Sequence, residues 1–416
     1  MDSAAVWIVI TGALVAASCA LLGCFLVLRR RALLGDAISH AVLPGIVIAF
    51  LMTSSTTSLP MFLGAAALGL LTAFLVETLS RGGVQGDAAI GVTFTSLFAF
   101  GVVLVSRYAA QKDLDLDCVL YGEIAYVPFD TIGPLPRAVV VNAVLLALNV
   151  IVVGLLYKEF KLCAFDPGMA AAVGIPVAAI HYLLMALVSV TTVGAFESVG
   201  AILVVAMLIV PSATAYLLTD RLGMMLALAA GLGAAASVGG YLMARWLGCS
   251  IAGAMATVSG LCFTVAFLFS PSHGVFTRLV AYQRLRRVVL EEDILLWAGR
   301  RSEGGEPAPF GIRELVRGIE RLPNEVTLTA GRLLHTGLLA RTGEEYRLTR
   351  LGVARAIELL RRHRIYESYL GELGYPVDHI HAPADRVEHH LTPTLTAAVD
   401  EAVHHPETDP QGKRIR

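Results

Sequence analysis

Long apolar segments recur along the first two thirds of the chain. Nine of them approach the length that crosses a bilayer, near residues 5–28, 40–53, 60–80, 88–106, 138–157, 177–194, 197–218, 222–243 and 251–270. A membrane helix needs about 20 apolar residues, because its backbone hydrogen bonds must close within the segment. The second run is short and is interrupted at Pro44 and Gly45, so eight spans are an alternative. The pattern predicts an all-α polytopic membrane domain with eight or nine transmembrane helices.

The last third of the chain has a different pattern. Residues 275–290 continue in helical rhythm and predict a linker helix near the lipid surface. Amphipathic helical patterning follows up to Pro323, which begins a second helix, and 338–349 read as two short strands about a Gly-containing turn. Helix, turn, helix and hairpin is the order of a winged helix-turn-helix. We therefore expect a membrane domain over 1–274 and a mainly α soluble domain over 291–416.

Composition supports two unlike parts. The chain is 56% hydrophobic and 16% charged, which is typical of a polytopic membrane protein. Of the 32 Lys and Arg residues, 21 lie after Phe276. Asp and Glu nearly balance these bases, so the tail is not a polybasic arm that binds nucleic acid by charge alone.

The distribution of basic residues between the spans predicts the orientation. With nine spans and an outer N-terminus, the cytoplasmic loops hold Arg29, Arg30, Arg31, Arg81, Lys158, Lys161 and Arg221, and the outer loops hold Arg107, Lys112, Arg137 and Arg245. This bias agrees with the positive-inside rule and places the tail in the cytoplasm of a bacterial cell, below the inner membrane. The acidic stretch Asp113, Asp115 and Asp117 then lies outside, either as a docking site for a metal-delivering protein or as a solvated loop.

Few ionisable residues lie within the apolar runs, and each is a candidate site because burying charge in lipid is costly. Asp36 and His40 are spaced i, i+4, so one helix face would present a carboxylate and an imidazole to a dication. The alternative is an Asp that caps the helix and an interfacial His. Glu197, at the expected outer start of the seventh span, is either an entry ligand for the cation or an interfacial loop residue.

Three segments of the membrane part, 23–50, 165–176 and 200–218, resemble the zinc, manganese and iron class of ABC permeases. The resemblance implies a cytoplasmic coupling segment, FDPGMAAAVGIP, with Phe165, Asp166, Pro167 and Gly174. A plain interhelical loop is the alternative. No G-x-x-x-x-G-K-[ST] phosphate loop occurs in the sequence. We therefore expect a permease subunit that binds no nucleotide and is not an enzyme. Its expected partners are a separate ATPase subunit, an extracytoplasmic metal-binding protein and a second permease subunit, identical or homologous.

Metal-ligand spacing recurs near the C-terminus. His363 and Glu367 are spaced i, i+4, whereas His381, Asp385, Glu388 and His389 occupy i, i+4, i+7 and i+8. Each set shares one helix face, and converging imidazole and carboxylate groups suit first-row dications. Charged surface helices are the alternative.

Segments 363–370, 379–392 and 405–416 resemble the diphtheria toxin repressor family of iron and manganese sensors. The resemblance implies a helical metal-binding and dimerisation domain beside the winged helix. Its implied ancillary site is His363, Glu367 and His381, and its regulatory site is Asp385, Glu388 and His389 with Asp293. Oxygen ligands at Asp385 and Asp293 resemble the manganese-type sensors, but Leu296 stands where those carry another carboxylate. The expected recognition helix, 324–337, offers candidate DNA contacts at Asn324, Thr327, Thr329 and Arg332.

These expectations define a permease subunit of an ABC importer for a divalent metal ion, fused to a metal-sensing domain. Manganese is favoured, and zinc and iron stay open. The alternative is a bifunctional permease and metal-dependent repressor that binds operator DNA and is separated by proteolysis. An intramembrane metalloenzyme is a third class, but the spans contain no HExxH motif.

Overall fold

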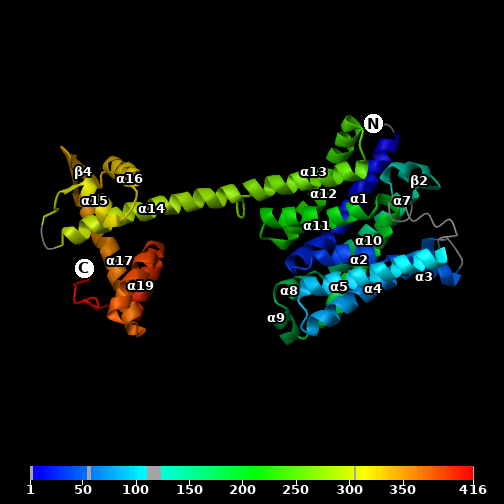
Figure 1. The fold of residues 1–416 in the computed structure, drawn as a ribbon, viewed down its shortest axis with the longest axis horizontal. Helices are drawn as coiled ribbons and strands as arrows, with labels where there is room; N and C mark the ends of the chain where they lie inside the picture. Colours follow the sequence, from blue (N-terminus) through cyan, green and yellow to red (C-terminus); the bar gives the residue numbers. More distant parts are fainter. Residues whose placement is uncertain (1–2, 54–57, 110–122, 304–305, 416) are drawn as a thin grey trace. The chain divides into compact units, whose positions relative to one another are not determined.

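The computed structural model describes residues 3–53, 58–109, 123–303 and 306–415. They form two compact units, Met1–Thr277 and Arg278–Arg416, whose elements are drawn in Figure 1. The expected docking aspartates, Asp113, Asp115 and Asp117, lie outside the described residues.

The first unit is a bundle of apolar helices. Its elements are α1 (Ser3–Leu28), α2 (Leu33–Ala41), α3 (Leu43–Thr53), α4 (Ser58–Arg81), α5 (Gly86–Leu104), the π-helical turn η1 (Val105–Ala109), the 3-10 helix η2 (Ile124–Phe129), β1 (Thr131–Ile132), β2 (Leu135–Pro136), α7 (Arg137–Leu155), α8 (Tyr157–Phe165), α9 (Pro167–Ala172), α10 (Val177–Val199), α11 (Ala201–Leu218), α12 (Leu222–Leu247) and α13 (Ile251–Phe269). Within the described ranges, nine helical segments are long and apolar enough to cross a membrane. The prediction of a polytopic helical domain is confirmed.

Two boundaries differ from the sequence-based expectation. The second span is the pair α2 and α3, Leu33–Thr53, so it begins before the expected residue 40. Pro44, which lacks an N–H, lies in the first turn of α3, where that donor would have no helical partner. Gly200, with φ +80°, separates α10 from α11, so Glu197 lies in the last turn of α10 and not at the start of the next span.

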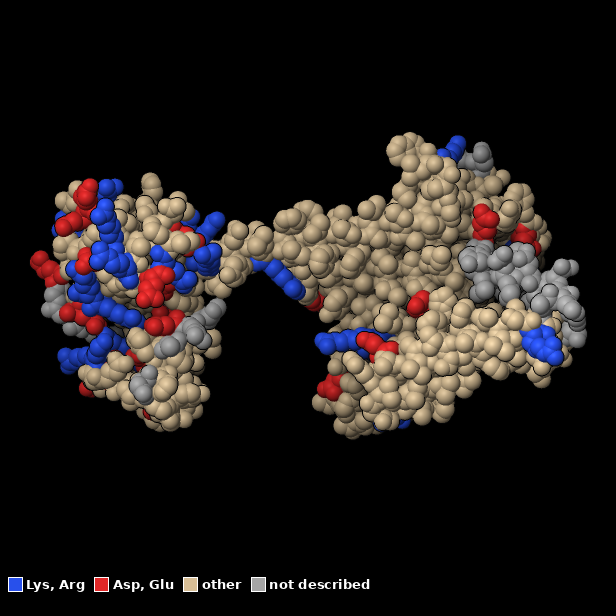
Figure 2. Space-filling model, viewed as in Figure 1, with Lys and Arg blue, Asp and Glu red and all other residues tan. Residues whose placement is uncertain are grey.

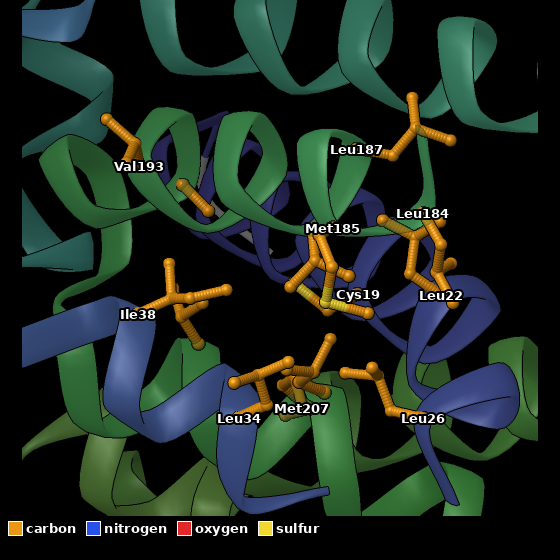
Figure 3. Packing of buried hydrophobic residues seen from close by; sticks show 14 of the residues in the cluster. Cys19, Leu22, Leu26, Leu34, Ile38, Leu184, Met185, Leu187, Val193 and Met207 are labelled. Carbon is orange, nitrogen blue, oxygen red and sulfur yellow. The ribbon is translucent and has the colours of Figure 1, made fainter. Parts of the chain in front are cut away.

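Helix α1 is central to the core of the first unit. Its buried residues Cys19, Leu22 and Leu26 pack with residues of α2, α10 and α11 (Figure 3). A Cβ atom on Gly23 would lie 1.8 Å from the carbonyl oxygen of Leu208, so α1 and α11 are in backbone contact there. In the absence of water, such close packing is a main source of helix association in a membrane.

A charged network joins the ends of α4 and α10 to the turn after α1. Glu77 accepts from Arg31 at 2.5 Å and from Arg81 at 3.0 Å, and its carboxylate lies 3.6 Å from Nε2 of His181. Arg29 contacts the other ring nitrogen of His181 at 3.3 Å. The carboxylate is thus paired, as its burial requires.

The second unit is α/β in its first half and helical in its second. Its elements are α14 (Val275–Arg301), which begins within the first unit, β3 (Phe310–Gly311), α15 (Ile312–Ile319), α16 (Pro323–His335), β4 (Leu339–Thr342), β5 (Glu345–Leu348), α17 (Arg350–Glu372), η3 (Val377–His379), α18 (His381–Val387), η4 (Glu388–His390) and α19 (Pro393–Ala402). Figure 2 shows acidic and basic side chains crowded on this unit and sparse on the other.

The helix, turn, helix and hairpin order is present in the second unit. Strands β4 and β5 form the expected hairpin, and β3 pairs with β5, giving the antiparallel order β3-β5-β4. The core includes Phe310 from the sheet with Leu315 and Val326 from the two helices. The expected linker is not a separate element, because α14 continues from 275 to 301.

We predict that Gly23→Ala disrupts the membrane bundle. The added Cβ meets the Leu208 carbonyl at 1.8 Å, and overpacking of this kind costs about 1–3 kcal/mol or more. In detergent, the variant should aggregate at a lower temperature than the wild type, and its size-exclusion chromatography peak should be smaller.

Gly154→Ala is the matched control, because a Cβ there has no atom within 4 Å. Equal thermal stability of the two variants would contradict the backbone contact between α1 and α11.

Candidate metal centre

Three predicted ligands converge where α17 meets the start of α18. Nε2 of His363 lies 3.1 Å from Oε1 of Glu367 and 3.2 Å from Nδ1 of His381. The same His381 nitrogen lies 2.6 Å from Oε1 of Glu367. The helical spacing i, i+4 places His363 and Glu367 on one face, and α18 packs His381 against it. The structure therefore brings together, as a first ligand set, the three residues that were predicted for the ancillary site.

His363 also belongs to a second ligand set. Its Nδ1 lies 2.5 Å from Oε2 of Glu388 and 3.5 Å from Oδ1 of Asp385, and these atoms are within 4.8 Å of one another. A neutral imidazole has a single lone pair, so His363 can bind a cation in only one of the two sets at a time. This sharing was not predicted from the sequence.

The remaining predicted ligands meet on the other side of Glu388. Nε2 of His389 lies 3.2 Å from Oδ1 of Asp293 and 3.5 Å from Oε1 of Glu388. Nδ1 of His389 lies 2.9 Å from Oε2 of Glu292, which also pairs with Arg355 at 2.9 Å. All seven predicted sensor residues therefore form one connected cluster.

Glu292 is a member of this cluster that the sequence analysis missed. It is buried and lies on the same helix face as Leu295, Leu296 and Gly299, which are also buried. A carboxylate on an otherwise buried apolar stripe needs a partner. This pattern in the sequence could have indicated that Glu292 belongs to a buried polar cluster. A second missed residue is Arg300, whose guanidinium contacts both Asp385 and His363.

Burial and neighbouring charges set the protonation of the cluster. Burial opposes the charge on each imidazole, but hydrogen bonds to Glu367 and Glu388 raise the pKa of His363 to about 9. Likewise, Asp293 and Glu292 overcome burial and raise the pKa of His389 to about 10. Burial opposes charge on Glu367, yet the two histidines lower its pKa to about 2.

The chemistry of the cluster fits a divalent first-row metal. Imidazole nitrogens and carboxylate oxygens are suitable ligands, and Glu367 and Glu388 are each only 2% exposed. Such carboxylates are costly to bury without a cation. His363, Glu367 and Glu388 therefore do not lie on a charged surface, whereas His381 and Asp385 are each 45% exposed.

In the first unit, Asp36 and His40 lie together on α2. Their closest side-chain atoms are 3.5 Å apart, and the helix cap is Ala32, so Asp36 does not cap the helix. His40 packs near the rings of Phe94 and Phe98 and lines a cavity of about 530 Å³.

Glu197 is not among the described residues that line this cavity. Its side chain is 63% exposed and lies 3.9 Å from Arg137. The structure therefore brings Asp36 and His40 together, and of these three candidates only His40 lines the cavity.

The predicted coupling segment is a short capped helix. The Asp166 carboxylate accepts a hydrogen bond from the N–H of Met169 at 2.8 Å, and Pro167 begins α9. Phe165 and Met169 are 58% and 54% exposed, and Gly174, with φ +89°, follows the helix. The segment thus presents apolar side chains on a defined helical scaffold.

The candidate DNA contacts on α16 differ in exposure. Asn324 and Thr327 are exposed, and Arg332 lies 3.9 Å from Glu291. Thr329, in contrast, is 3% exposed and packs inside the unit. Its prediction as a DNA contact is wrong, because the side chain faces the core.

Comparison with known proteins assigns the two parts of the chain to a transporter class and a regulator class. Residues 1–270 match the ABC 3 transport family, and residues 349–416 match the iron dependent repressor, metal binding and dimerisation domain. The chain belongs to the ABC 3 transport family.

Curated relatives and a solved structure agree with this assignment. The manganese transport system membrane protein MntD of Bacillus subtilis is 57% identical over 65% of this chain and 94% of its own length. The zinc transport system membrane protein TroD of Treponema pallidum is 40% identical over 84% of this chain and 97% of its own, so its similarity extends beyond residue 270. The structure of PsaBC from Streptococcus pneumoniae in complex with Fab covers 67% of this chain and 94% of its own, with 33% identity and TM-score 0.56.

We predict that metal binding at the cluster strengthens as pH rises. The pKa values of His363 and His389, about 9 and about 10, keep both imidazoles protonated near neutral pH. A cation must displace each proton that occupies a ligand nitrogen, so apparent affinity should increase by about tenfold per pH unit for each proton displaced. Manganese titration calorimetry of the full chain in buffers of unequal ionisation enthalpy counts the released protons.

As a control, Glu372→Gln on α17 removes an exposed carboxylate outside the cluster. This variant should show the same dependence of metal affinity on pH as the wild type. Affinity that stays constant from about pH 6 to about pH 8, with no proton release, would show that these imidazoles are not ligands.

Proposed function

We propose that this chain is the permease subunit of an ABC importer for divalent first-row metal ions, with manganese as the favoured cargo, and that its C-terminal unit senses the imported metal. The observation that carries the proposal is the pairing of two different metal-type sites in one chain. In the first unit, His40 lines the cavity and Asp36 lies 3.5 Å from it on α2, and the His363 cluster lies in the second unit. The 57% identity to a manganese transport protein supports the cargo.

The transport site works by offering ligands within a mainly apolar environment. Asp36 provides charge and an oxygen, and His40 provides a nitrogen, at 3.5 Å from each other. The ring centroids of Phe94 and Phe98 lie 5.6 Å and 6.0 Å from that of the imidazole. A partly hydrated dication entering from an extracytoplasmic binding protein would exchange water for these ligands.

Exposed apolar residues of the first unit support an ATPase subunit as one partner. The exposed Phe165 and Met169 of α8 and α9 suit an apolar groove on a separate ATPase subunit. A second permease copy or a homologue completes the path. The chain then lies in the bacterial inner membrane, in contact with lipid, with its C-terminal unit in the cytoplasm.

In the second unit, His363, Glu367 and His381 would hold one metal ion, and Asp385 and Glu388 with His389 and Asp293 would hold another. The bound ion would supply positive charge that neutralises these carboxylates and links α14, α17 and α18. A metal can shift only an equilibrium between states that it binds unequally. We propose that occupancy favours a state of the chain that restrains transport.

Substitutions at the membrane pair test the transport role. Asp36→Asn and His40→Ala should each reduce manganese uptake by at least about tenfold, since each removes one of the two proposed ligands of the ion path. Uptake of radioactive manganese is measured in cells that lack other manganese importers and carry the partner ATPase and binding protein. Competition by zinc and iron identifies the preferred cargo.

Asp87→Asn, an exposed acidic residue in the first turn of α5, is the control and should transport normally. Unchanged uptake in both site variants at normal expression would refute the role of the pair.

A sensor variant tests the regulatory role. Asp385→Ala removes a ligand of the second set, so uptake in metal-replete cells should stay about as high as in metal-starved cells. The wild type should lower its uptake severalfold on metal addition, as measured within minutes to exclude new synthesis. Glu372→Ala, on the exposed side of α17, should behave as wild type. If Asp385→Ala responds to metal as the wild type does, the sensor proposal fails.

A second candidate function is metal-dependent DNA binding, which the helix, turn, helix and hairpin order favours. Exposed Asn324 and Thr327 on α16 would contact the groove. Fluorescence anisotropy of a promoter fragment of the chain's own gene, mixed with the full chain in nanodiscs, distinguishes DNA binding from regulation of transport alone. Manganese-dependent binding lost in Asn324→Ala would support the repressor function, and no binding at low salt would exclude it.

A further inference from the structure

Arg300 reaches from the last turn of α14 into the metal centre. Its Nη2 atom lies 3.2 Å from Oδ1 of Asp385 and 3.3 Å from Nε2 of His363. The Asp385 oxygen belongs to the second ligand set, and the His363 nitrogen faces Glu367 and His381 in the first. One guanidinium therefore contacts ligand atoms of both sets.

We propose that Arg300 is a resident cation of the sensor, which stabilises the metal-free cluster and competes with the divalent ion for its ligands. This inference rests on the proposed sensing function of the second unit. It assigns Arg300 a role in setting the metal concentration to which the sensor responds.

The charge balance of the cluster supports this role. Glu367, Asp385 and Glu388 lie around His363, and two of these carboxylates are almost fully buried. His381 also contacts Glu367, and His389 also contacts Glu388. In contrast, the basic group that lies nearest to Asp385 among the described residues is Arg300, at 3.2 Å. Arg300 supplies a further positive charge, and because a guanidinium keeps its charge across the physiological pH range, the competition with metal persists at every such pH.

The surroundings of Arg300 allow the side chain to leave. A groove of about 710 Å³ is lined by Arg300 together with Asp293, Asp385, Glu388 and His389. The Arg300 side chain is 36% exposed, so it can turn toward water without opening a packed core. If Arg300 leaves, its ion pair with Asp385, which joins α14 to α18, is broken. Metal occupancy would therefore change a contact of α14, the helix that also carries Asp293.

The neighbouring Arg301 provides a matched control. It has the same charge and a similar exposure of 42%, but it pairs with Glu314 at 2.7 Å and lies over the ring of Trp297. Neither partner belongs to the ligand sets. Removing its charge should leave metal affinity unchanged.

The test measures manganese binding to the full chain in lipid nanodiscs through the electron paramagnetic resonance signal of free manganese. Arg300→Met keeps most of the side-chain length and removes the charge. We expect about fivefold to tenfold tighter binding at the C-terminal sites, the scale for loss of one half-exposed opposing charge near a dication. Arg301→Met and the charge-conserving Arg300→Lys should bind as the wild type does.

A second readout does not depend on metal. Thermal unfolding of the metal-free Arg300→Met chain should occur at a lower temperature than in the wild type, and added manganese should remove the difference. Arg300→Gln, which is uncharged but polar, must show the same tightening of manganese binding. If Arg300→Met and Arg300→Gln bind manganese as tightly as the wild type or more weakly, and keep its helical circular dichroism, the proposal is overturned. Arg300 would then only position Asp385.

A reference variant separates this inference from the function on which it rests. Combining Glu367→Gln, His381→Ala and Glu388→Gln removes ligands of both sets, so this variant should lose binding at the C-terminal unit and keep that of the membrane path. If the wild type and this reference bind the same amount of manganese, the sensing function itself is wrong. If they differ and Arg300→Met does not tighten binding, only the role of Arg300 is wrong.

Discussion

Ionisable groups that are withdrawn from water must be paired, and this constraint shapes both units. In the first unit, Glu77 is held by Arg31 and Arg81. In the second, the buried Glu367 and Glu388 are held through His363. Without a partner, each buried carboxylate would either take up a proton or lower the free energy of unfolding by roughly several kcal/mol. A divalent cation satisfies the same requirement, so a site built on paired carboxylates is close to a metal site.

The two candidate metal sites use related chemistry for different tasks. Asp36 and His40 offer two ligands that are 44% and 41% exposed, which suits an ion that must enter and leave. The His363 cluster offers more ligands and deeper burial, which suits an ion that stays bound long enough to be sensed. A weaker path and a tighter sensor in one chain are the physical requirements of feedback on import.

Much of this organisation could be predicted from the sequence because its signals are local. Apolar runs near membrane length predicted the spans, and i, i+4 spacing predicted that His363 and Glu367 share a helix face. The second ligand helix was expected to continue through His389, but α18 ends at Val387 and the 3-10 helix η4 carries Glu388 and His389. The ends of some helices and the way in which elements pack against one another could not be predicted. The positive φ of Gly200 placed Glu197 on α10, and the packing of α16 turned Thr329 inward. Glu292 and Arg300 joined the cluster through contacts between residues 60 to 100 positions apart, which no spacing rule reveals.

The central claim is that the ion carried by the membrane unit is sensed by the C-terminal unit of the same chain. The most direct test is ATP-driven manganese uptake by reconstituted vesicles, with free manganese buffered on the ATP-binding side. The full chain is compared with a chain that ends at residue 274. The account predicts that the initial rate of the full chain falls as this free manganese rises, while the shortened chain keeps a constant rate. The same dependence on manganese in both chains would contradict it.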